Sequence, residues 1–307
     1  MVAFSRFARY FDELADKGSI RRAAERLNIV PSALDRQLIL AEQELGLPLF
    51  ERLPQGLRLT AAGELLVHGL RNWLRDYRRL LSQIDDLRGL RRGSVNLAVV
   101  EGVIQDLVPD LLAAFYRKYP GITCHVRVVA GEAVEQLVLN GEADVGLSFN
   151  PQESRGLHVA HSVTYRMGAL LPPGHALLKL AKLRLSDLAQ TPVIIADEST
   201  SVRRVLDQAL RKTGVTLQPV VVVSQVSLIR SLVLRGVGVG LLTEIGALPE
   251  IADGSIVFRG LAEASISPSV MCALTATGRH LPVPAALLTE ELVTMMELSK
   301  GKAAKSA

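Results

Sequence analysis

The stretch that decides the fold runs from residue 18 to residue 66 and reads GSIRRAAERLNIVPSALDRQLILAEQELGLPLFERLPQGLRLTAAGELL. Ser19 is a candidate N-cap of a short helix, in which the pair Ala23 and Ala24 would let a second helix approach closely. Pro31 suits the first turn of that second helix, because its missing N–H is not needed there. Two short helices joined by a tight turn form the arrangement that enters the major groove of DNA.

The exposed side of the second helix carries most of the residues expected to reach DNA. Arginine and glutamine side chains can form paired hydrogen bonds with base edges, so Arg36 and Gln37 have suitable chemistry. The candidates on the two helices are Arg21, Pro31, Ser32, Asp35, Arg36 and Gln37.

A β-hairpin is predicted directly after these helices. The segment PLFERLPQGLRLT, residues 48–60, alternates apolar and polar residues on both sides of the turn sequence Pro54-Gln55-Gly56. Arg52 and Arg58 flank the turn on the polar side, where they can reach phosphates or an adjacent minor groove. We interpret the hairpin as the wing of a winged helix-turn-helix domain.

Helices are predicted on both sides of this domain core. Apolar residues recur at three- and four-residue steps from Phe4 to Leu14, and Gly18 ends that stripe. After Thr60, a plausible N-cap, the chain has no proline up to about Leu90, which predicts one long helix. Its apolar positions form a heptad seam that favours a partner helix, although such a stripe can also pack on the chain's own body. The seam consists of Leu66, Leu70, Trp73, Tyr77, Leu80, Ile84 and Leu87.

Beyond Gly93 the pattern changes to short β-branched runs that alternate with helices. The runs SVNLAVV, ITCHVRVV and DVGLSF are separated by helical segments, an order that predicts a parallel sheet. A second set begins at Met167 with MGALL, VIIA, VVVVS and VGLLT. The chain then returns through SPSVMCALTA and closes with a helix from Pro284 to Leu298, so two α/β lobes are expected.

Composition indicates a folded protein of about two domains whose positive charge is concentrated in the first third. The 307 residues are 49% hydrophobic and 21% charged. Residues 1–92 hold 16 Lys and Arg against 12 Asp and Glu, whereas 19 basic and 19 acidic residues cancel in the rest. Charges interrupt the N-terminal segment and no apolar run is long enough for a membrane helix, so a cytoplasmic protein is expected.

The sequence offers no motif for catalysis, for a metal or for a cofactor. The six histidines have no paired ligand spacing, and neither a GxSxG elbow nor a Walker motif is present. Cys124 and Cys272 stand alone in apolar segments, where buried reduced thiols are expected and a redox-sensing pair is the alternative. We therefore expect no enzyme and no cofactor other than a small-molecule effector.

The first third resembles the DNA-binding segment of the LysR-type family of bacterial transcriptional regulators. Matching features include the pairs Ala23-Ala24 and Arg36-Gln37, the run Pro31-Ser32-Ala33, and the stretches Glu44-Leu45-Gly46, Pro48-Leu49-Phe50 and Leu59-Thr60-Ala61-Ala62-Gly63. The remainder is similar, more loosely, to the periplasmic-binding-protein-like effector domain of that family.

This resemblance implies a multidomain architecture. It assigns residues 1–61 to the winged helix-turn-helix domain, 62–92 to a linker and dimerisation helix, and 93–300 to the effector domain, with residues 301–307 as a disordered tail. Lobe one of the effector domain would comprise 93–165 and 268–300, and lobe two 166–267. A homodimer, which is expected to assemble further into a dimer of dimers, is expected to bind an interrupted inverted repeat near a promoter, with RNA polymerase as a further candidate partner.

Effector-binding residues are expected where strands end and helices begin, because ligands of open α/β sheets lie outside the carboxyl ends of the strands. Hydroxyls at three successive positions and the helix amides beside them could hold an anion such as a carboxylate. The candidates are Glu101, Gly102, Val103, Ser199, Thr200, Ser201, Ser224, Gln225 and Thr243.

Departures from the family pattern affect specificity. Asp35 stands where the family usually has serine, so it must accept a hydrogen bond from a base or lie away from the DNA backbone. Ala41-Glu42 replaces the usual Leu-Glu. Glu101 stands where many relatives have Ser or Thr, and its carboxylate would oppose an anionic effector unless it is paired, so neutral and amine-bearing effectors stay open.

The function expected is a sequence-specific DNA-binding regulator whose activity a small molecule modulates. The alternative is a metabolic enzyme or a solute-binding domain with an accessory DNA-binding domain.

Overall fold

The computed structural model describes residues 3–87 and 93–305, which fall into two compact units, residues 1–84 and 85–307. We call them the DNA-binding unit and the effector unit and describe each by itself.

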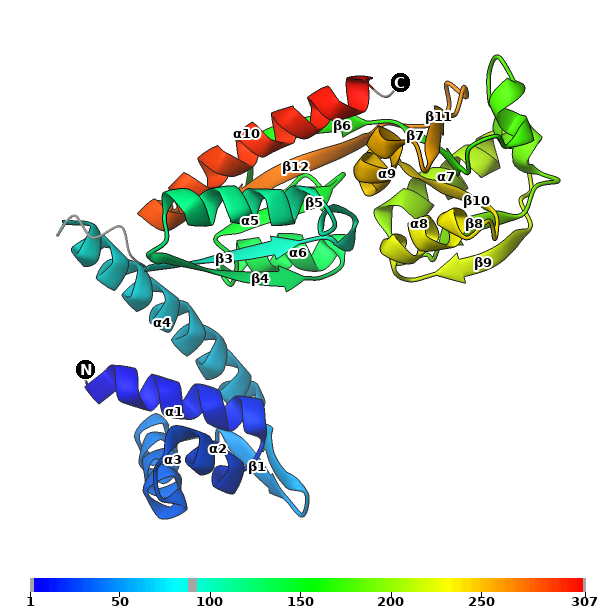
Figure 1. The fold of residues 1–307 in the computed structure, drawn as a ribbon. Helices are drawn as coiled ribbons and strands as arrows, with labels where there is room; N and C mark the ends of the chain where they lie inside the picture. The colour runs from blue at the N-terminus through cyan, green and yellow to red at the C-terminus, as the bar shows by residue number, and fades with distance from the viewer. Residues whose placement is uncertain (1–2, 88–92, 306–307) are drawn as a thin grey trace. The chain divides into compact units, whose positions relative to one another are not determined.

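The DNA-binding unit contains the predicted helices and hairpin (Figure 1). Its elements are α1 (Ala3–Lys17), α2 (Ile20–Leu27), α3 (Pro31–Leu45), β1 (Phe50–Leu53), β2 (Gly56–Leu59) and α4 (Ala61–Leu87). Gly18 and Asn28 end α1 and α2 with positive φ values of 56° and 54°, and Pro31 is the first residue of α3, as predicted. Ser19 occupies the N-cap position of α2, but its side chain makes no capping hydrogen bond.

Helix α4 starts in close contact with the hairpin. The Thr60 hydroxyl accepts a hydrogen bond from the amide of Gly63 at 3.1 Å and donates one to the carbonyl oxygen of Pro48 at 2.7 Å. A Cβ atom on Gly63 would lie only 2.1 Å from the carbonyl oxygen of Leu49, so no other residue fits there without a shift of the backbone. These contacts join α4 to the hydrophobic core of the unit, where Phe11 packs on Phe50.

The first half of the predicted heptad seam packs on the chain's own body, which corrects the dimerisation residues. Leu70 is only 4% exposed within the core of the DNA-binding unit, and Leu66 and Trp73 pack against that core. The reason is that α4 passes over α1 and the hairpin before it extends further. Tyr77 stacks on Trp73 with ring centroids 5.4 Å apart, and Leu80 is 51% exposed. The side chains of Ile84 and Leu87 lie outside the described residues.

Lobe one of the effector unit is a five-stranded sheet with strand order β4-β3-β5-β12-β6. Helices α5 and α10 pack on one face, while α6 packs on the other. Its elements are β3 (Gly93–Val99), η1 (Glu101–Val103), α5 (Leu107–Lys118), β4 (Ile122–Val128), α6 (Gly131–Leu139), β5 (Val145–Phe149), β6 (Leu157–Tyr165), β12 (Ser269–Ala276) and α10 (Val283–Lys305).

Lobe two is a second five-stranded sheet with strand order β11-β7-β10-β8-β9. Helix α7 packs on one face and α8 on the other. Its elements are β7 (Met167–Leu171), η2 (Ala176–Lys179), η3 (Leu185–Leu188), β8 (Val193–Ala196), α7 (Ser201–Thr213), β9 (Pro219–Val223), α8 (Val226–Leu234), β10 (Val239–Thr243), η4 (Glu244–Ala247), α9 (Leu248–Asp253) and β11 (Val257–Gly260).

The predicted parallel pairing of β3, β4 and β5 is confirmed, but each complete sheet is mixed. Strand β12 runs antiparallel to β5 and β6, and β7 runs antiparallel to β10 and β11. The reason is that one strand of each sheet, β12 in lobe one and β7 in lobe two, opposes the direction of the βαβ strands. Strands β6 and β11 were not predicted from the sequence.

The predicted disordered tail is also wrong over its described part. Helix α10 continues to Lys305, and Ala303 is 6% exposed in the core of lobe one. Burial of one face of the last turns explains why a short polar segment is helical there.

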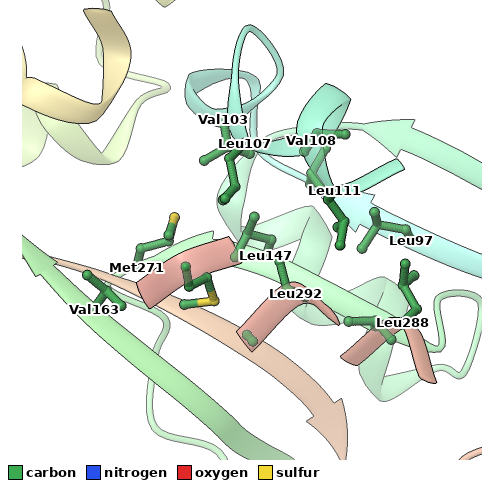
Figure 2. Packing of buried hydrophobic residues seen from close by; sticks show 14 of the residues in the cluster. Leu97, Val103, Leu107, Val108, Leu111, Leu147, Val163, Met271, Leu288 and Leu292 are labelled. Atoms are coloured by element: carbon green, nitrogen blue, oxygen red, sulfur yellow. The ribbon is translucent and has the colours of Figure 1, made fainter. Parts of the chain in front are cut away.

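Val103 belongs to the hydrophobic core of lobe one. It is 1% exposed and, as Figure 2 shows, its side chain lies beside Leu107 and among the leucines that join α5 to the sheet and α10. The prediction that Val103 contacts the effector is therefore wrong, because its side chain points into the core.

Candidate functional site

The exposed surface of α3 presents the polar residues predicted from the sequence. Ser32, Arg36 and Gln37 are exposed, whereas Leu34 and Leu38 on the opposite side are buried in the core. Within the described residues, the guanidinium of Arg36 makes no hydrogen bond or ion pair, so it is available to an outside partner. Pro31 is exposed at the first turn of the same helix.

The side chain of Asp35 is held by the hairpin. Its Oδ1 atom accepts a hydrogen bond from Nη2 of Arg52 at 2.7 Å, which ties α3 to strand β1. From the sequence, two environments were predicted for the Asp35 carboxylate: a hydrogen bond from a DNA base, or a position away from the DNA phosphates. In the structure, the carboxylate of Asp35 instead binds the arginine of the hairpin, Arg52, so two of the predicted DNA-binding residues contact each other.

The other predicted arginines also have acidic partners within the unit. Arg58 donates through Nε and Nη2 to Oε2 of Glu51 across the hairpin, at 3.1 and 2.6 Å. Arg21 pairs with Glu25 one turn along α2 at 3.3 Å, a contact between two well-exposed side chains. Such exposed pairs contribute at most about 1 kcal/mol, so phosphate can displace the carboxylates.

A second site is a cleft of about 280 Å³ in the effector unit, formed between its two lobes. Lobe one contributes residues that follow β3 and β4 and the end of β5, and lobe two contributes the starts of α7 and α8 and the end of β10. The lining consists of Val100, Glu101, Gly102, Val128, Val129, Ala130, Gly131, Phe149, Ser199, Thr200, Ser201, Val202, Ser224, Gln225, Val226, Leu242, Thr243, Gly246 and Ser269.

The cleft brings together every predicted effector residue except Val103. The sequence analysis missed its apolar walls, among them Val128, Phe149 and Leu242, and also Ser269 at the start of β12. Their position in the sequence could have identified these residues, because they lie at strand ends, as the predicted polar residues do.

Glu101 reaches from lobe one to the first turn of α8 in lobe two. Its Oε2 accepts a hydrogen bond from the amide of Val226, and its Oε1 accepts one from the amide of Ser227 at 3.0 Å. The carboxylate therefore caps the helix and lies at its positive end. This pairing is the condition under which a carboxylate is tolerated in the cleft.

Two further contacts join the lobes beside the cleft. Nη1 of Arg204 lies 3.5 Å from a carboxylate oxygen of Glu132, and Nη2 of Arg230 donates to Oε1 of Gln105 at 2.9 Å. Arg230 also pairs with Glu250 at 3.2 Å.

Several hydroxyl groups in the cleft lack a partner within the described chain. Thr243 is 6% exposed and Ser269 is 3% exposed, and neither side chain makes a hydrogen bond there. By contrast, the Thr200 hydroxyl accepts a hydrogen bond from the amide of Arg203 at 3.3 Å and caps α7. Both residues line the cleft and the described chain supplies no partner for their hydroxyls, so these groups are suited to a ligand.

Burial raises the pKa values of several groups outside the cleft. Burial raises the pKa of the Glu244 carboxyl group, whose Oε1 accepts a hydrogen bond from the amide of Arg166 while its buried Oε2 has no partner. Burial likewise raises the pKa of Glu135. Burial raises the pKa of Tyr165 to about 12, and its hydroxyl hydrogen-bonds to Ser299.

The two cysteines are free and well separated. Cys124 lies on β4 and Cys272 on β12, with β3 and β5 between them in the sheet. Three strand spacings amount to roughly 14 Å, too far for a disulfide without rearrangement. Burial raises the pKa of both thiols. This arrangement favours the reading of buried reduced thiols over a redox pair.

Residues 3–87 and 93–305 contain no cluster of three or more His, Cys, Asp or Glu side chains that could hold a metal ion. Over the same residues, no helix combines the length and the apolar character required to cross a bilayer.

Two family models match the chain. The model of the bacterial regulatory helix-turn-helix protein, lysR family, covers residues 6–64, and the model of the LysR substrate binding domain covers residues 88–297. The chain therefore belongs to the LysR family of transcriptional regulators, and the predicted domain types and function are confirmed.

Individual relatives agree with this assignment. The chain is 26% identical over 235 residues to a RuBisCO operon transcriptional regulator of Allochromatium vinosum, covering 76% of this chain and 78% of the relative. It is 26% identical over 249 residues to the transcriptional activator protein LysR of Escherichia coli, covering 81% and 80%. Its fold is similar to that of full-length CbnR complexed with its target DNA, with a TM-score of 0.67, 20% identity and coverage of 95% and 99%.

Proposed function

We propose that this LysR-family chain acts as a homodimer that binds an interrupted inverted repeat through α3 and the wing, and that a small molecule in the interlobe cleft controls it. The observation that carries the proposal is the cleft, because its lining comes from both lobes and includes buried hydroxyls without partners. A ligand that contacts both lobes changes the free energy of their closure.

The DNA side of the proposal rests on the exposed surface of α3. Arg36 and Gln37 stand beside each other on the face opposite the core, where they can reach base edges. Arg52 and Arg58 lie on the hairpin and are suited to phosphate once they exchange their carboxylate partners.

Self-association is proposed through the later part of α4. Leu80 is exposed on a helix that has already passed the core of the DNA-binding unit. Pairing of two such helices would set two recognition helices on a symmetric site. Assembly into a dimer of dimers and contact with RNA polymerase are further parts of the proposal.

Control is proposed to act by ligand-dependent spacing of the DNA-binding units. Closure of the cleft around a ligand would change the geometry that the effector units impose on the dimer, and with it the bend of the bound DNA. A chain that binds DNA acts where the chromosome is, so we place it in the cytoplasm.

We also propose that the protein acts without catalysis and without a cofactor beyond the effector. Glu101 is the only ionisable side chain among the residues that line the described cleft, and two backbone amides already occupy its carboxylate. A general acid or base needs a group that is free to exchange a proton with a substrate.

The test is a gel shift and a footprint of the full-length protein on DNA that flanks its own coding region, across a salt series and against scrambled competitor. A protected inverted repeat that is sensitive to salt and resistant to competitor is expected. Equal binding to scrambled DNA would contradict sequence-specific regulation. Identical footprints and bend angles with and without a ligand proven to bind the cleft would contradict the mechanism of control.

A further inference from the structure

The N-termini of three helices, α6, α7 and α8, line the cleft, and the first turn of α6 carries a carboxylate of its own, Glu132. The ends of α7 and α8 are used differently from each other. At α8, the amides of Val226 and Ser227 already donate to Glu101. At α7, a helix of 13 residues, Thr200 caps the amide of Arg203, while the amides of Ser201 and Val202 have no acceptor within the described chain. Of these two helix ends, the one at α8 is therefore filled from inside the protein and the one at α7 is open.

The open end at α7 faces a cleft whose polar groups are suited to a single anion. None of the lining residues in the described cleft is Lys, Arg or His, so the available donors are uncharged: helix amides, hydroxyls and the side-chain amide of Gln225. The nearby carboxylate of Asp197 accepts hydrogen bonds from the amide and hydroxyl of Ser199 and does not line the cleft.

A second, independent observation is the pair of buried hydroxyls at Thr243 and Ser269. Both side chains are more than nine-tenths buried, both line the cleft, and neither has a partner within the described residues. Hydroxyls can donate to or accept from a neutral oxygen, but they bring no charge to balance another anion. Much of the remaining wall is apolar, including Val100, Phe149 and Leu242.

From these observations we infer that the cleft takes a monocarboxylate with an apolar body and one hydroxyl or carbonyl group, and that Glu101 excludes ligands with a second carboxylate. The ligand carboxylate lies at the first turn of α7, and its neutral oxygen is bound by Thr243 and Ser269. The inference rests on the proposed function of the cleft as the effector site.

Glu101 determines this specificity in two ways. Its negative charge repels a second carboxylate, and its oxygens occupy the α8 amides that would otherwise receive one. A ligand with two carboxylates would have to displace Glu101 and leave that charge without its partners, which is costly in a partly buried site.

Ligands that differ only at one end test this inference. The full-length protein is titrated calorimetrically with meta-hydroxybenzoate, isophthalate and meta-hydroxybenzamide, which share a ring and carry one, two and no carboxylates. A second series of hydroxyhexanoate, adipate and hydroxyhexanamide covers an aliphatic body. In at least one series the monocarboxylate is expected to bind at least about tenfold more tightly than both other members.

Three variants assign the effect to residues. In Glu101→Ser, the ratio of the affinity for the monocarboxylate to the affinity for the dicarboxylate is expected to fall by at least about tenfold, because the α8 amides become free. Glu101→Gln, which keeps the size of the side chain, should shift the ratio in the same direction and serves if Glu101→Ser does not fold. Ser269→Ala should weaken the hydroxylated monocarboxylate while leaving the preference for one carboxylate in place.

Three results would overturn the inference: a wild-type preference for the dicarboxylate or the amide, absence of binding by both monocarboxylates at millimolar concentration, or an unchanged ratio in both Glu101 variants. The DNA footprint distinguishes failure of this inference from failure of the proposed function, because it tests DNA binding without any of these ligands. A protein that protects its inverted repeat but rejects the monocarboxylates remains a regulator with a different ligand.

Discussion

Two sets of carboxylates, one in each unit of this protein, are used in opposite ways. In the DNA-binding unit, acidic side chains such as Asp35 lie on the surface and pair with arginines such as Arg52. In the effector unit, Glu101, Glu135 and Glu244 are more enclosed and accept hydrogen bonds from backbone amides. The difference separates charges that can change partners from charges that are part of the fold.

For Asp35 and Glu101, this difference follows from what each unit is proposed to bind. An arginine that meets phosphate needs a partner it can leave at small cost, and an exposed pair supplies one. A cleft that must distinguish small molecules needs fixed groups, and carboxylates held by backbone amides cannot move without breaking the structure around them.

The largest expected effect is a loss of stability when a buried residue of the DNA-binding unit is made smaller. If the first half of α4 belongs to the DNA-binding unit, Leu70→Ala should lower the free energy of unfolding of that unit by about 2–5 kcal/mol, because it leaves a cavity in the core. Urea unfolding followed by the fluorescence of Trp73, the only tryptophan, measures it.

Leu80→Ala is the matched control, since Leu80 lies on the same helix and is exposed. It should lower self-association, measured by sedimentation, with little effect on the Trp73 transition of the dilute protein. Equal loss of stability in the two variants would contradict the division of α4 into a packed half and an exposed half.

The next effect concerns the exposed surface of α3. Arg36→Ala should weaken binding to the footprinted DNA site by about 1–3 kcal/mol, because it removes a side chain suited to a base edge. Fluorescence anisotropy with labelled DNA measures the change. Arg211→Ala, at an exposed arginine in the last turn of α7, should bind DNA like the wild type. Wild-type affinity in Arg36→Ala would remove Arg36 from the proposed interface.

A smaller effect on stability and DNA binding is expected when the ion pair between Asp35 and Arg52 is removed. Asp35→Ala frees Arg52 from its partner at 2.7 Å and should change the free energy of unfolding by no more than about 1 kcal/mol. The salt dependence of DNA binding should steepen by about one phosphate contact. The double variant Asp35→Ala with Arg52→Ala should lose that added slope. A slope that stays constant in Asp35→Ala would mean that Arg52 already contacts phosphate while it is paired.

The smallest effect is expected at a buried carboxyl group and depends on pH. Burial raises the pKa of Glu244, so the folded protein holds this proton more tightly than the unfolded chain does. The free energy of unfolding of the wild type should therefore fall as the pH rises from the ordinary carboxyl range through the higher folded-state value. Glu244→Gln carries no charge and should not show this fall.

Denaturant unfolding of both proteins at a series of pH values tests the expectation. The difference in free energy of unfolding should move in favour of Glu244→Gln as the pH rises and then become constant. Glu153→Gln, at an exposed glutamate, provides the control. A difference that does not change with pH would mean that the amide of Arg166 and its side chain, 4.0 Å from the carboxylate, offset the effect of burial.

The DNA-binding unit could be predicted almost completely because its signals are local. Caps, breakers and the hairpin turn follow one another between Gly18 and Gly63, and each acts on its immediate neighbours in the chain. The failure came at Leu70, since a heptad spacing describes one face of a helix but does not say whether that face meets a partner or the chain's own core.

The effector cleft could be predicted only at its polar positions. Strand ends identified Glu101, Ser201 and Thr243, but the capping of α8 by Glu101 joins residues that are 125 positions apart. No local pattern specifies such a contact. Val103 was misplaced for a related reason, because two residues along a short helical turn separate a side chain in the cleft from one in the core.

The order of strands in lobe one has a consequence for synthesis. Strand β12 lies between β5 and β6, yet the ribosome makes it only after the whole of lobe two. The sheet of lobe one therefore stays incomplete until nearly all of the chain has been translated, whereas the DNA-binding unit consists of residues made first and can fold as a unit during translation. In a nascent chain, the DNA-binding unit can therefore be folded before the effector unit that is proposed to control it is complete.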